Sequence, residues 1–373
     1  MVRYLLRKWH MCYERALSAI YLEDTDRVAQ IEYIFHTDLI RKLAGFDPFL
    51  NPEKALAKTY EKLDTDMIFY TQQSIDPYAE ARKTNRKSFT ERENWSKLYP
   101  STWRLEHQVS SEEDVLNYEP SLGGLSFDQV FEMFSQTHAH HQKLYRSQLV
   151  PGGYYCTTFM WCVMHFGLEW TIRAAARDPR RFEKLLSRFA EISLQDFKAW
   201  SMCEIKAFIS HDDICMTEGP IMNPSWLRRY IFPWYERLWQ ILKARGIRVI
   251  FCSDGNIDKI IDDIAKAGAD GFILEPSCNL ESAVDRYGYD KIIMGNVDLK
   301  ALTFGKREDA VREVTRCLSV AGHCPGYFIN VTGSIPDNVP IENLESYFEA
   351  CRKYGLKPKS SLFGVSHFTR AGT

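Results

Sequence analysis

Residues 247–298 read IRVIFCSDGNIDKIIDDIAKAGADGFILEPSCNLESAVDRYGYDKIIMGNVD. This stretch holds three short apolar runs, which end at Cys252, Leu274 and Met294, and the segments between them have the apolar spacing of helices. Near-continuous apolar strands that alternate with helices are typical of a parallel sheet covered by helices. The stretch therefore predicts an α/β fold.

The same alternation continues on both sides of this stretch. Further strands are expected at residues 67–71, 103–109, 154–160, 205–210 and 327–331, and further helices at 307–320 and 341–354. Together these strands make eight, which predicts a (β/α)8 TIM barrel over residues 61–373, with residues 1–60 as an N-terminal helical extension and no linker between domains. A doubly wound sheet is the alternative, but no GxGxxG or GxxxxGK[ST] loop follows any expected strand.

Composition excludes several classes of protein. The chain has 373 residues, 45% of them hydrophobic and 26% charged, and a formal net charge of -2, so no basic excess indicates a nucleic-acid partner. The uncharged stretch 147–168 is interrupted by Pro151-Gly152-Gly153, so we expect no membrane span. Ten scattered cysteines without a CxxC pair, and no signal-peptide pattern at the start, predict a cytoplasmic protein with reduced thiols.

Polar residues follow five successive strands, at the end of a barrel where active sites lie. They are His211, Asp212, Asp213 and Glu218; Cys252, Ser253, Asp254, Gly255 and Asn256; Glu275, Ser277 and Cys278; Asn296 and Asp298; and Thr332, Gly333 and Ser334. The set is rich in acids and poor in bases. Turns and helix caps are the alternative roles for Asp254-Gly255-Asn256 and for Asn296 and Asp298. The histidines at 138, 140 and 141 are expected to serve packing or the surface rather than a metal.

Several of these segments also carry a family resemblance. Phe251-Cys-Ser-Asp-Gly-Asn256, Gly268-Ala-Asp-Gly271, Met294-Gly-Asn-Val-Asp298 and Val339-Pro-Ile-Glu-Asn343 are similar to the uroporphyrinogen decarboxylase superfamily, as are Asp212-Asp213 and Asn223-Pro224. The resemblance implies a (β/α)8 barrel and leaves two branches open. The decarboxylases trim acetate groups on a tetrapyrrole and grip carboxylates with an arginine-rich segment near the N-terminus, which this chain lacks. The other branch contains the corrinoid-dependent methyltransferases.

The second branch raises the question of a metal. In its coenzyme M methyltransferases, a His-x-Cys motif after the fifth strand and a cysteine after the eighth hold a zinc ion that activates a thiol. The matching positions here are Cys252, Asp254 and Ser334, a poor set for zinc because serine seldom ligates it. Zinc is thus doubtful as a cofactor, and a methyltransferase acting from methylcobalamin to a thiol is an alternative rather than the first choice.

The resemblance and the acids together lead to a hypothesis of O-demethylation. The expected enzyme is a methyltransferase that moves the methyl group of a methyl ether, above all a methoxylated aromatic, to a corrinoid (cobalamin) on a partner protein, and it is compatible with a homodimer. Asp254 or Glu275 would protonate the leaving oxygen, or these two with Cys252 would hold a metal. The residues expected to bind substrate are Tyr154, Trp161, Asp213, Glu218, Asn296, Asp298 and Ser334. A tetrapyrrole decarboxylase and a non-catalytic scaffold are the competing hypotheses.

Overall fold

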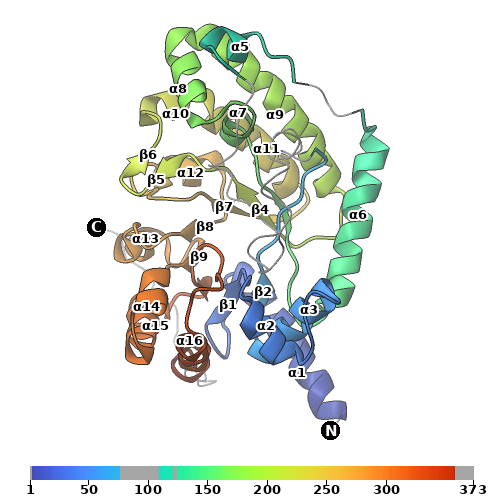
Figure 1. Ribbon diagram of the computed structural model, residues 1–373, viewed down its shortest axis with the longest axis vertical. Helices are drawn as coiled ribbons and strands as arrows, with labels where there is room; N and C mark the ends of the chain where they lie inside the picture. Colours follow the sequence, from blue (N-terminus) through green and yellow to red (C-terminus); the bar gives the residue numbers. More distant parts are fainter. Residues whose placement is uncertain (1, 76–108, 121–123, 358–373) are drawn as a thin grey trace, which may run out of the picture.

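Eight parallel strands form the centre of the molecule in a computed structural model that describes residues 2–75, 109–120 and 124–357 (Figure 1). In sheet order the strands are β2 (Met67–Ile68), β1 (Ala29–Glu32), β10 (Tyr327–Ile329), β9 (Ile292–Gly295), β8 (Gly271–Leu274), β7 (Arg248–Cys252), β4 (Ala207–His211) and β3 (Gly152–Tyr154). The barrel closes between β2 and the segment just before β3, because Met67 bridges Leu149 in parallel and the Ile68 N–H donates to the Leu149 carbonyl at 3.2 Å. The predicted TIM-barrel fold is confirmed.

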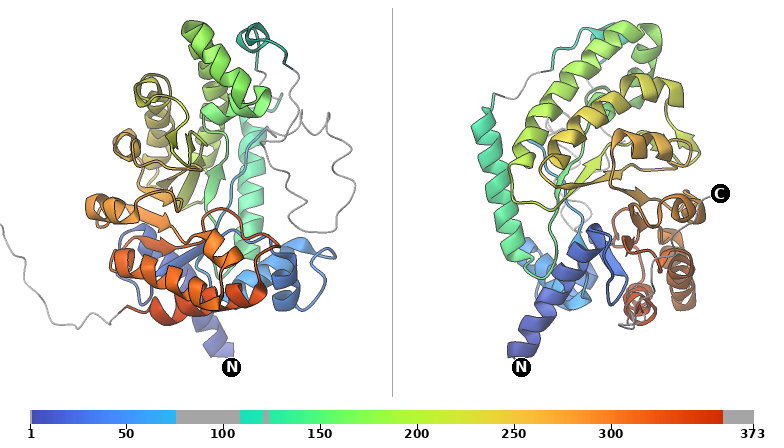
Figure 2. Two further views of the ribbon diagram at one scale, coloured as in Figure 1. Left: turned by 60° about the vertical axis from the view of Figure 1, so that its left-hand side comes forward. Right: turned by 180° about the vertical axis from the view of Figure 1, so that it is seen from behind.

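Helices surround the strands, and a two-stranded antiparallel hairpin, β5 (Cys215–Met216) and β6 (Gly219–Pro220), follows β4 (Figures 1 and 2). The helices are α1 (Val2–Ile20), α2 (Thr37–Ala44), α3 (Pro52–Leu63), α5 (Glu112–Leu116), α6 (Phe127–Leu144), α7 (Phe159–Phe166), α8 (Leu168–Arg177), α9 (Pro179–Ser201), α10 (Pro224–Tyr230), α11 (Phe232–Lys243), α12 (Ile261–Ala267), α13 (Leu280–Tyr287), α14 (Leu299–Phe304), α15 (Arg307–Ala321) and α16 (Ile341–Tyr354). Across the described residues, no helix combines the length and apolarity that crossing a membrane requires.

The first barrel strand differs from the prediction. Strand β1 lies at Ala29–Glu32, inside the segment 1–60 that is expected to be a helical extension, and it pairs with both β2 and β10. Its alternation explains why it is easily missed, because only Ala29 and Ile31 pack into the apolar barrel interior, whereas Glu32 is a buried acid. The strand expected at residues 103–109 lies almost wholly outside the described residues.

The third strand is also shorter than predicted. Residues 154–160 are expected to be one strand, but β3 ends at Tyr154 and helix α7 begins at Phe159. The buried carboxylate of Asp212, at the end of β4, accepts the backbone N–H groups of Thr158, Phe159 and Met160 at 2.7–3.0 Å. A carboxylate at the N-terminus of a helix satisfies N–H groups that have no partner within the helix, so the helix starts here.

The barrel is closed at one end and open at the other. Ala16, Ala19 and Ile20 of α1 pack with the apolar residues that fill the barrel interior, and Tyr21 lies against Arg248 at the start of β7. Helix α1 therefore covers the end at which the strands begin, and Figure 1 shows it below them. The opposite end, where the strands finish, carries the polar residues.

Candidate active site

Three titratable groups meet at the carboxyl ends of β4 and β7. His211 is the last residue of β4, Asp213 follows two residues later, and Asp254 comes two residues after β7. The two strands are paired with His211 opposite Cys252, which places their ends side by side. One ligand atom from each of His211, Asp213 and Asp254 lies within 4.8 Å of the others.

Asp213 is the hub of this cluster. Its carboxylate accepts the Tyr155 hydroxyl at 3.0 Å, His211 Nε2 at 2.9 Å and the backbone N–H of Asp254 at 2.8 Å. Burial alone would raise the pKa of Asp213, but the charge and the hydrogen bond of His211 outweigh burial and hold the pKa below its ordinary value. Asp213 is therefore the anion that fixes the positions of its neighbours.

His211 is the matching cation. Burial alone would lower the pKa of His211, but Cys252 and Asp213 oppose burial and raise that pKa well above its ordinary value. The shift favours the protonated ring, whose Nε2 lies 2.9 Å from the Asp213 carboxylate. The other ring nitrogen, Nδ1, is buried and has no hydrogen-bond partner among the described residues.

The pKa of Asp254 lies near neutral pH. Its side chain is accessible from the open end of the barrel, but the surrounding protein removes much of its hydration. This loss of hydration, followed by the charge of Asp213 and opposed by that of His211, raises the pKa of Asp254 to about 7, with Glu275 raising it further. Burial likewise raises the pKa of Glu275, whose Oε2 accepts the Gly255 N–H at 3.0 Å.

Aromatic rings line the other half of the open end. Tyr33, Phe69 and Tyr155 directly follow β1, β2 and β3, and all three are half-buried. The centroid of the Tyr155 ring lies 4.5 Å and that of Phe69 6.0 Å from the His211 ring, both edge to face, and Tyr33 lies 4.9 Å from Phe69. The site therefore has an aromatic wall made by the first three strands and an acidic wall made by β4, β7 and β8.

The structure brings together part of the predicted site. Asp213, Asp254 and Glu275 lie in the acidic wall, and Cys252 lies beside His211 at 8% exposure in the barrel interior. His211, one of the polar residues expected after the fourth strand, and Tyr155 belong to the site, although neither is among the residues expected to act in catalysis or to bind substrate. The signal for Tyr155 is its place directly after an apolar strand, on the side opposite to Tyr154.

Other predicted substrate-binding residues lie elsewhere. Tyr154 and Trp161 are fully buried, and their rings pack against Phe197 and Phe189 of α9, between the sheet and its covering helices. Alternation along β3 explains this difference, because Tyr154 faces the helices and Tyr155 does not.

Four more predicted residues serve structure or stand apart. Asn296 is buried and donates to the carbonyls of Glu275 and Cys278, and Asp298 caps α14 by accepting the Lys300 N–H at 2.8 Å. Glu218 is exposed in the turn of the β5–β6 hairpin, and Ser334 is half-buried in the segment that follows β10. Asp298 thus serves as the cap of α14, the alternative role considered for it.

The Asp254-Gly255-Asn256 segment combines both roles considered for it. Gly255 has φ of 82°, and a Cβ atom there would lie 2.4 Å from the Met216 carbonyl oxygen, so only glycine fits. The Asn256 side chain donates to the Ser277 carbonyl at 2.5 Å and thereby ties the turn to the loop after β8. The turn therefore holds the chain against the hairpin and presents Asp254 at the open end.

Metal ligation is compatible with a different set of residues from the one predicted. His211, Asp213 and Asp254 form the group within ligand distance among the described residues, rather than Cys252, Asp254 and Glu275. One imidazole and two carboxylates are donors that suit zinc or another divalent transition metal with open positions. His138, His140 and His141 form no such group in the part of the chain that the structure describes, since His138 bonds to the Val150 carbonyl and His140 to Glu53.

Comparison with known proteins identifies a family whose sequences resemble this chain. Residues 105–354, more than half of the chain, match the family described as uroporphyrinogen decarboxylase (URO-D). The uroporphyrinogen decarboxylase of Carboxydothermus hydrogenoformans is 28% identical over 171 residues, 46% of this chain and 47% of that protein. That of Citrifermentans bemidjiense is 30% identical over 165 residues, 44% of this chain and 47% of that protein, so the chain matches about half the length of these relatives.

The whole fold has a counterpart among solved structures. A methyltransferase from Methanosarcina mazei superposes with a TM-score of 0.63 over 92% of this chain and 99% of that one, at 15% sequence identity. At this identity the likeness concerns the fold alone. From the match of its sequence over residues 105–354 and from its barrel, the chain belongs to the uroporphyrinogen decarboxylase (URO-D) family.

Proposed function

We propose that this protein transfers the methyl group of an aryl methyl ether to the cobalt of a corrinoid carried by a partner protein. The observation that carries the proposal is the pairing of an aromatic wall with a carboxyl group, Asp254, whose pKa is raised to about 7. The Methanosarcina mazei protein that shares this fold is a methyltransferase, so methyl transfer is compatible with this barrel.

A methyl ether needs acid assistance because an unprotonated alkoxide or phenoxide is a poor leaving group. The corrinoid is the methyl acceptor, and its reduced cobalt supplies the electron pair that takes the methyl group as the C–O bond breaks. The electrons of that bond stay on the ether oxygen, and the Asp254 proton moves to this oxygen, so the product is a phenol. Asp254 is open to solvent and can recover its proton between turnovers.

The neighbours of Asp254 keep it in this role. Asp213 fixes the position of the residue by accepting its backbone N–H, and the negative charge of Asp213 favours the protonated form of the Asp254 carboxyl group. His211 balances the charge of Asp213, while Tyr155 ties that carboxylate to the aromatic wall. An aryl ring packed on Tyr155 and Phe69 would bring its methoxy oxygen toward the acids.

The two other activities fit this site less well. A tetrapyrrole bearing acetate groups needs cations around its carboxylates, whereas the cluster contributes Asp213, Asp254 and Glu275 with one imidazolium. Transfer to a thiol by the zinc route of the coenzyme M enzymes needs three ligands at the positions of Cys252, Asp254 and Ser334, and serine seldom ligates zinc.

A spectral assay tests the proposal. The protein is mixed with free cob(I)alamin and a panel of methoxyaromatics, methyl alkyl ethers and methylamines, and the conversion to methylcob(III)alamin is followed by absorbance. We expect conversion with methoxyaromatics and release of the matching phenol in equal amount. Failure with every ether, using folded protein with and without added divalent metal, would overturn the proposal, and conversion with an amine alone would reassign the donor.

A further inference from the structure

Two buried oxygen atoms just after β10 have no hydrogen-bond partner among the described residues. They are Oδ1 of Asn330 and Oγ1 of Thr332, in residues that are 7% and 6% exposed. A buried acceptor without a partner lowers stability, because it has lost its bonds to water and gains none in the protein. Native structures keep few such atoms. The two oxygens therefore need a partner that the chain itself does not supply.

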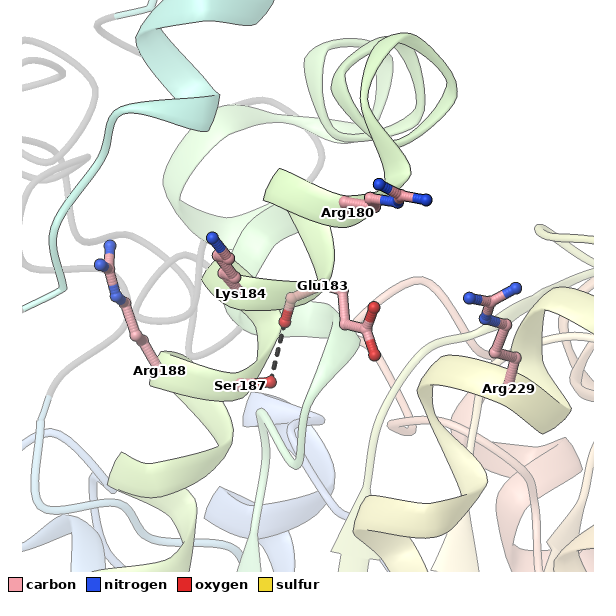
Figure 3. A pocket seen from close by; sticks show the side chains of 6 residues that line it. All are labelled: Arg180, Glu183, Lys184, Ser187, Arg188 and Arg229. Carbon is pink, nitrogen blue, oxygen red and sulfur yellow. Dashed lines mark hydrogen bonds between the residues drawn. The ribbon is translucent and has the colours of Figure 1, made fainter.

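Charged side chains at the surface have no such need. A pocket of about 620 Å³ outside the barrel, between α9 and α10, is lined by Arg180, Glu183, Lys184, Ser187, Arg188 and Arg229 (Figure 3). The five charged residues of this pocket are exposed, so water hydrates them, and Ser187 donates its hydroxyl to the Glu183 carbonyl at 2.8 Å. The buried oxygens after β10 have neither water nor a neighbour of this kind.

The orientation of the Asn330 amide is fixed by the next residue. Its Nδ2 donates to the Val331 carbonyl at 3.1 Å, and the reversed amide would set two oxygen atoms against each other. The oxygen is therefore the end of the side chain that lacks a partner. An amide oxygen only accepts hydrogen bonds, so the missing partner is a donor.

Asn330 faces the barrel interior. Phe328 packs among the residues that fill this interior, whereas Ile329 and Val331 pack in the core that the helices cover. Pairing with β9 continues to Val331, so alternation along the chain turns Asn330 inward. Because α1 closes the other end of the barrel, the exposed part of Asn330 lies toward the open end. A small rotation about its last torsion, which is broad in asparagine, turns the oxygen toward a ligand there.

Neither neighbouring strand satisfies this oxygen. The register of β1 and β10, continued by one residue, places the apolar Ile31 opposite Asn330. On the β9 side the opposite residue is Asn296, whose Oδ1 accepts Arg316 of α15 at 3.2 Å and whose Nδ2 donates to two backbone carbonyls. A donor must therefore enter from the open end.

We propose that Asn330 and Thr332 form a subsite for a neutral hydroxyl group on the aromatic ring of the substrate. A hydroxyl group suits both residues, because it donates to the Asn330 oxygen and accepts from the Thr332 hydroxyl. A carboxylate or phenolate has no proton to donate, and an ammonium group cannot accept. The inference rests on the proposed function and narrows its substrates to methoxyaromatics that carry a free ring hydroxyl.

The subsite adjoins the aromatic wall. The Ile335 N–H donates to the Tyr33 carbonyl at 2.8 Å, so the segment after β10 runs beside Tyr33 of that wall. Strands β9 and β8 separate β10 from β7, and Asp254 follows β7 by two residues. A ring packed on the wall would therefore be held by its hydroxyl on one side and protonated at its methoxy oxygen on another.

Ligand binding without cobalt tests the inference. Dissociation constants of the three methoxyphenol isomers are measured by isothermal titration calorimetry and compared with those of the matching methoxytoluenes, in which a methyl group replaces the hydroxyl. The test variants are N330L and T332V, and the second keeps the shape of the side chain. The matched control is N343L, which replaces another buried asparagine, in α16, whose Nδ2 donates to the Leu302 and Gly305 carbonyls.

We expect the wild-type protein to bind at least one methoxyphenol about tenfold or more tightly than its methoxytoluene. N330L should remove this preference, T332V should weaken it and N343L should keep it. The midpoint of chemical denaturation should not fall in N330L, which loses an oxygen without a partner, but should fall in N343L, which loses two hydrogen bonds.

Equal affinity of the wild-type protein for both ligand series, or an unchanged preference in N330L, would overturn the inference and assign the oxygen to a bound water. A greater loss of stability in N330L than in N343L would also overturn it, because Asn330 would then serve the fold. A preference that N330L removes, together with no methyl transfer in the spectral assay, would uphold the subsite and refute the proposed function. The two failures are therefore distinguishable.

Discussion

Replacement of Asp254 by asparagine is the sharpest test of the candidate active site. The amide keeps the size of the side chain and the backbone N–H that donates to Asp213, but it carries no proton to transfer. If Asp254 protonates the leaving oxygen, D254N should reduce the rate of demethylation by roughly 10²- to 10⁴-fold, the usual contribution of a general acid.

The pKa of Asp254 determines what fraction of its carboxyl groups can donate a proton at neutral pH. With a pKa of about 7, about half of the Asp254 carboxyl groups carry a proton at pH 7. At the ordinary value of 3.8 the fraction would be about 1 in 1,600, because the difference of 7 minus 3.8 is 3.2 pH units. The surroundings of Asp254 thus increase the protonated form by about 800-fold at neutral pH.

The pH profile follows from the sign of this shift. The active form is protonated, so the rate should be highest below pH 7 and fall as pH rises through about 7. Glu275 is one of the charges that raise the pKa of Asp254, so E275Q should move the fall to lower pH. The amide side chain in this variant would still offer an oxygen to the Gly255 N–H, which limits structural damage.

E275Q needs a control variant that loses the same charge outside the cluster. E218Q removes the same charge from the exposed turn of the β5–β6 hairpin and should leave the profile unchanged. Rates are measured from pH 6 to 9 with free cob(I)alamin and the preferred methoxyaromatic. A D254N rate within threefold of wild type throughout this range would refute the role of Asp254, and an unmoved E275Q profile would refute the electrostatic account.

Three further outcomes are expected. Added Zn²⁺ should inhibit demethylation more strongly at pH 8 than at pH 6, because metal ligation requires the deprotonated Asp254 carboxylate. A chelator should restore the rate. Activation of demethylation by zinc would contradict this prediction. G255A should lower the free energy of unfolding by at least about 1–3 kcal/mol in chemical denaturation, because its methyl group would meet the Met216 carbonyl in a left-handed turn; wild-type stability would show that the turn relaxes. Burial raises the pKa of Glu32 to about 8, against the hydrogen bonds of Tyr347 and Gln30, so the wild-type protein loses stability as pH rises from about 4.5 to 8. Relative to wild type, the free energy of unfolding of E32Q should therefore increase by up to roughly 1.4 kcal/mol per pH unit in this range. Parallel stability curves of the two proteins would contradict this prediction.

The sequence predicts strands well where they are continuously apolar. Strands β7, β8 and β9 and helix α16 lie within one or two residues of their expected positions. Strand β1 is missed because its Gln30 and Glu32 are polar yet buried, a combination that depends on Tyr347, more than 300 residues away in the sequence. The start of α7 is missed for the same kind of reason, since Asp212 supplies its cap from another strand.

The site is predictable in its acids but not in its organisation. A position after a strand is enough to nominate Asp213, Asp254 and Glu275, because the carboxyl ends of parallel strands converge. It does not reveal which of two adjacent acids is structural, and Asp212 proves to be the one that caps α7. It also does not reveal that Tyr155 rather than Tyr154 faces the site, since one residue of register along β3 decides between them.

Asp213 sets the conditions under which a proton and a divalent metal compete for Asp254. Its single carboxylate joins Tyr155, His211 and the backbone of Asp254, and its charge is among the causes that raise the pKa of Asp254 to about 7. A metal ligand must be deprotonated, whereas a general acid must be protonated. With a pKa near 7, proton and divalent metal compete for Asp254 in the physiological range. The same three residues can therefore serve proton donation or metal ligation but not both at once, and the pH dependence of zinc inhibition distinguishes the two.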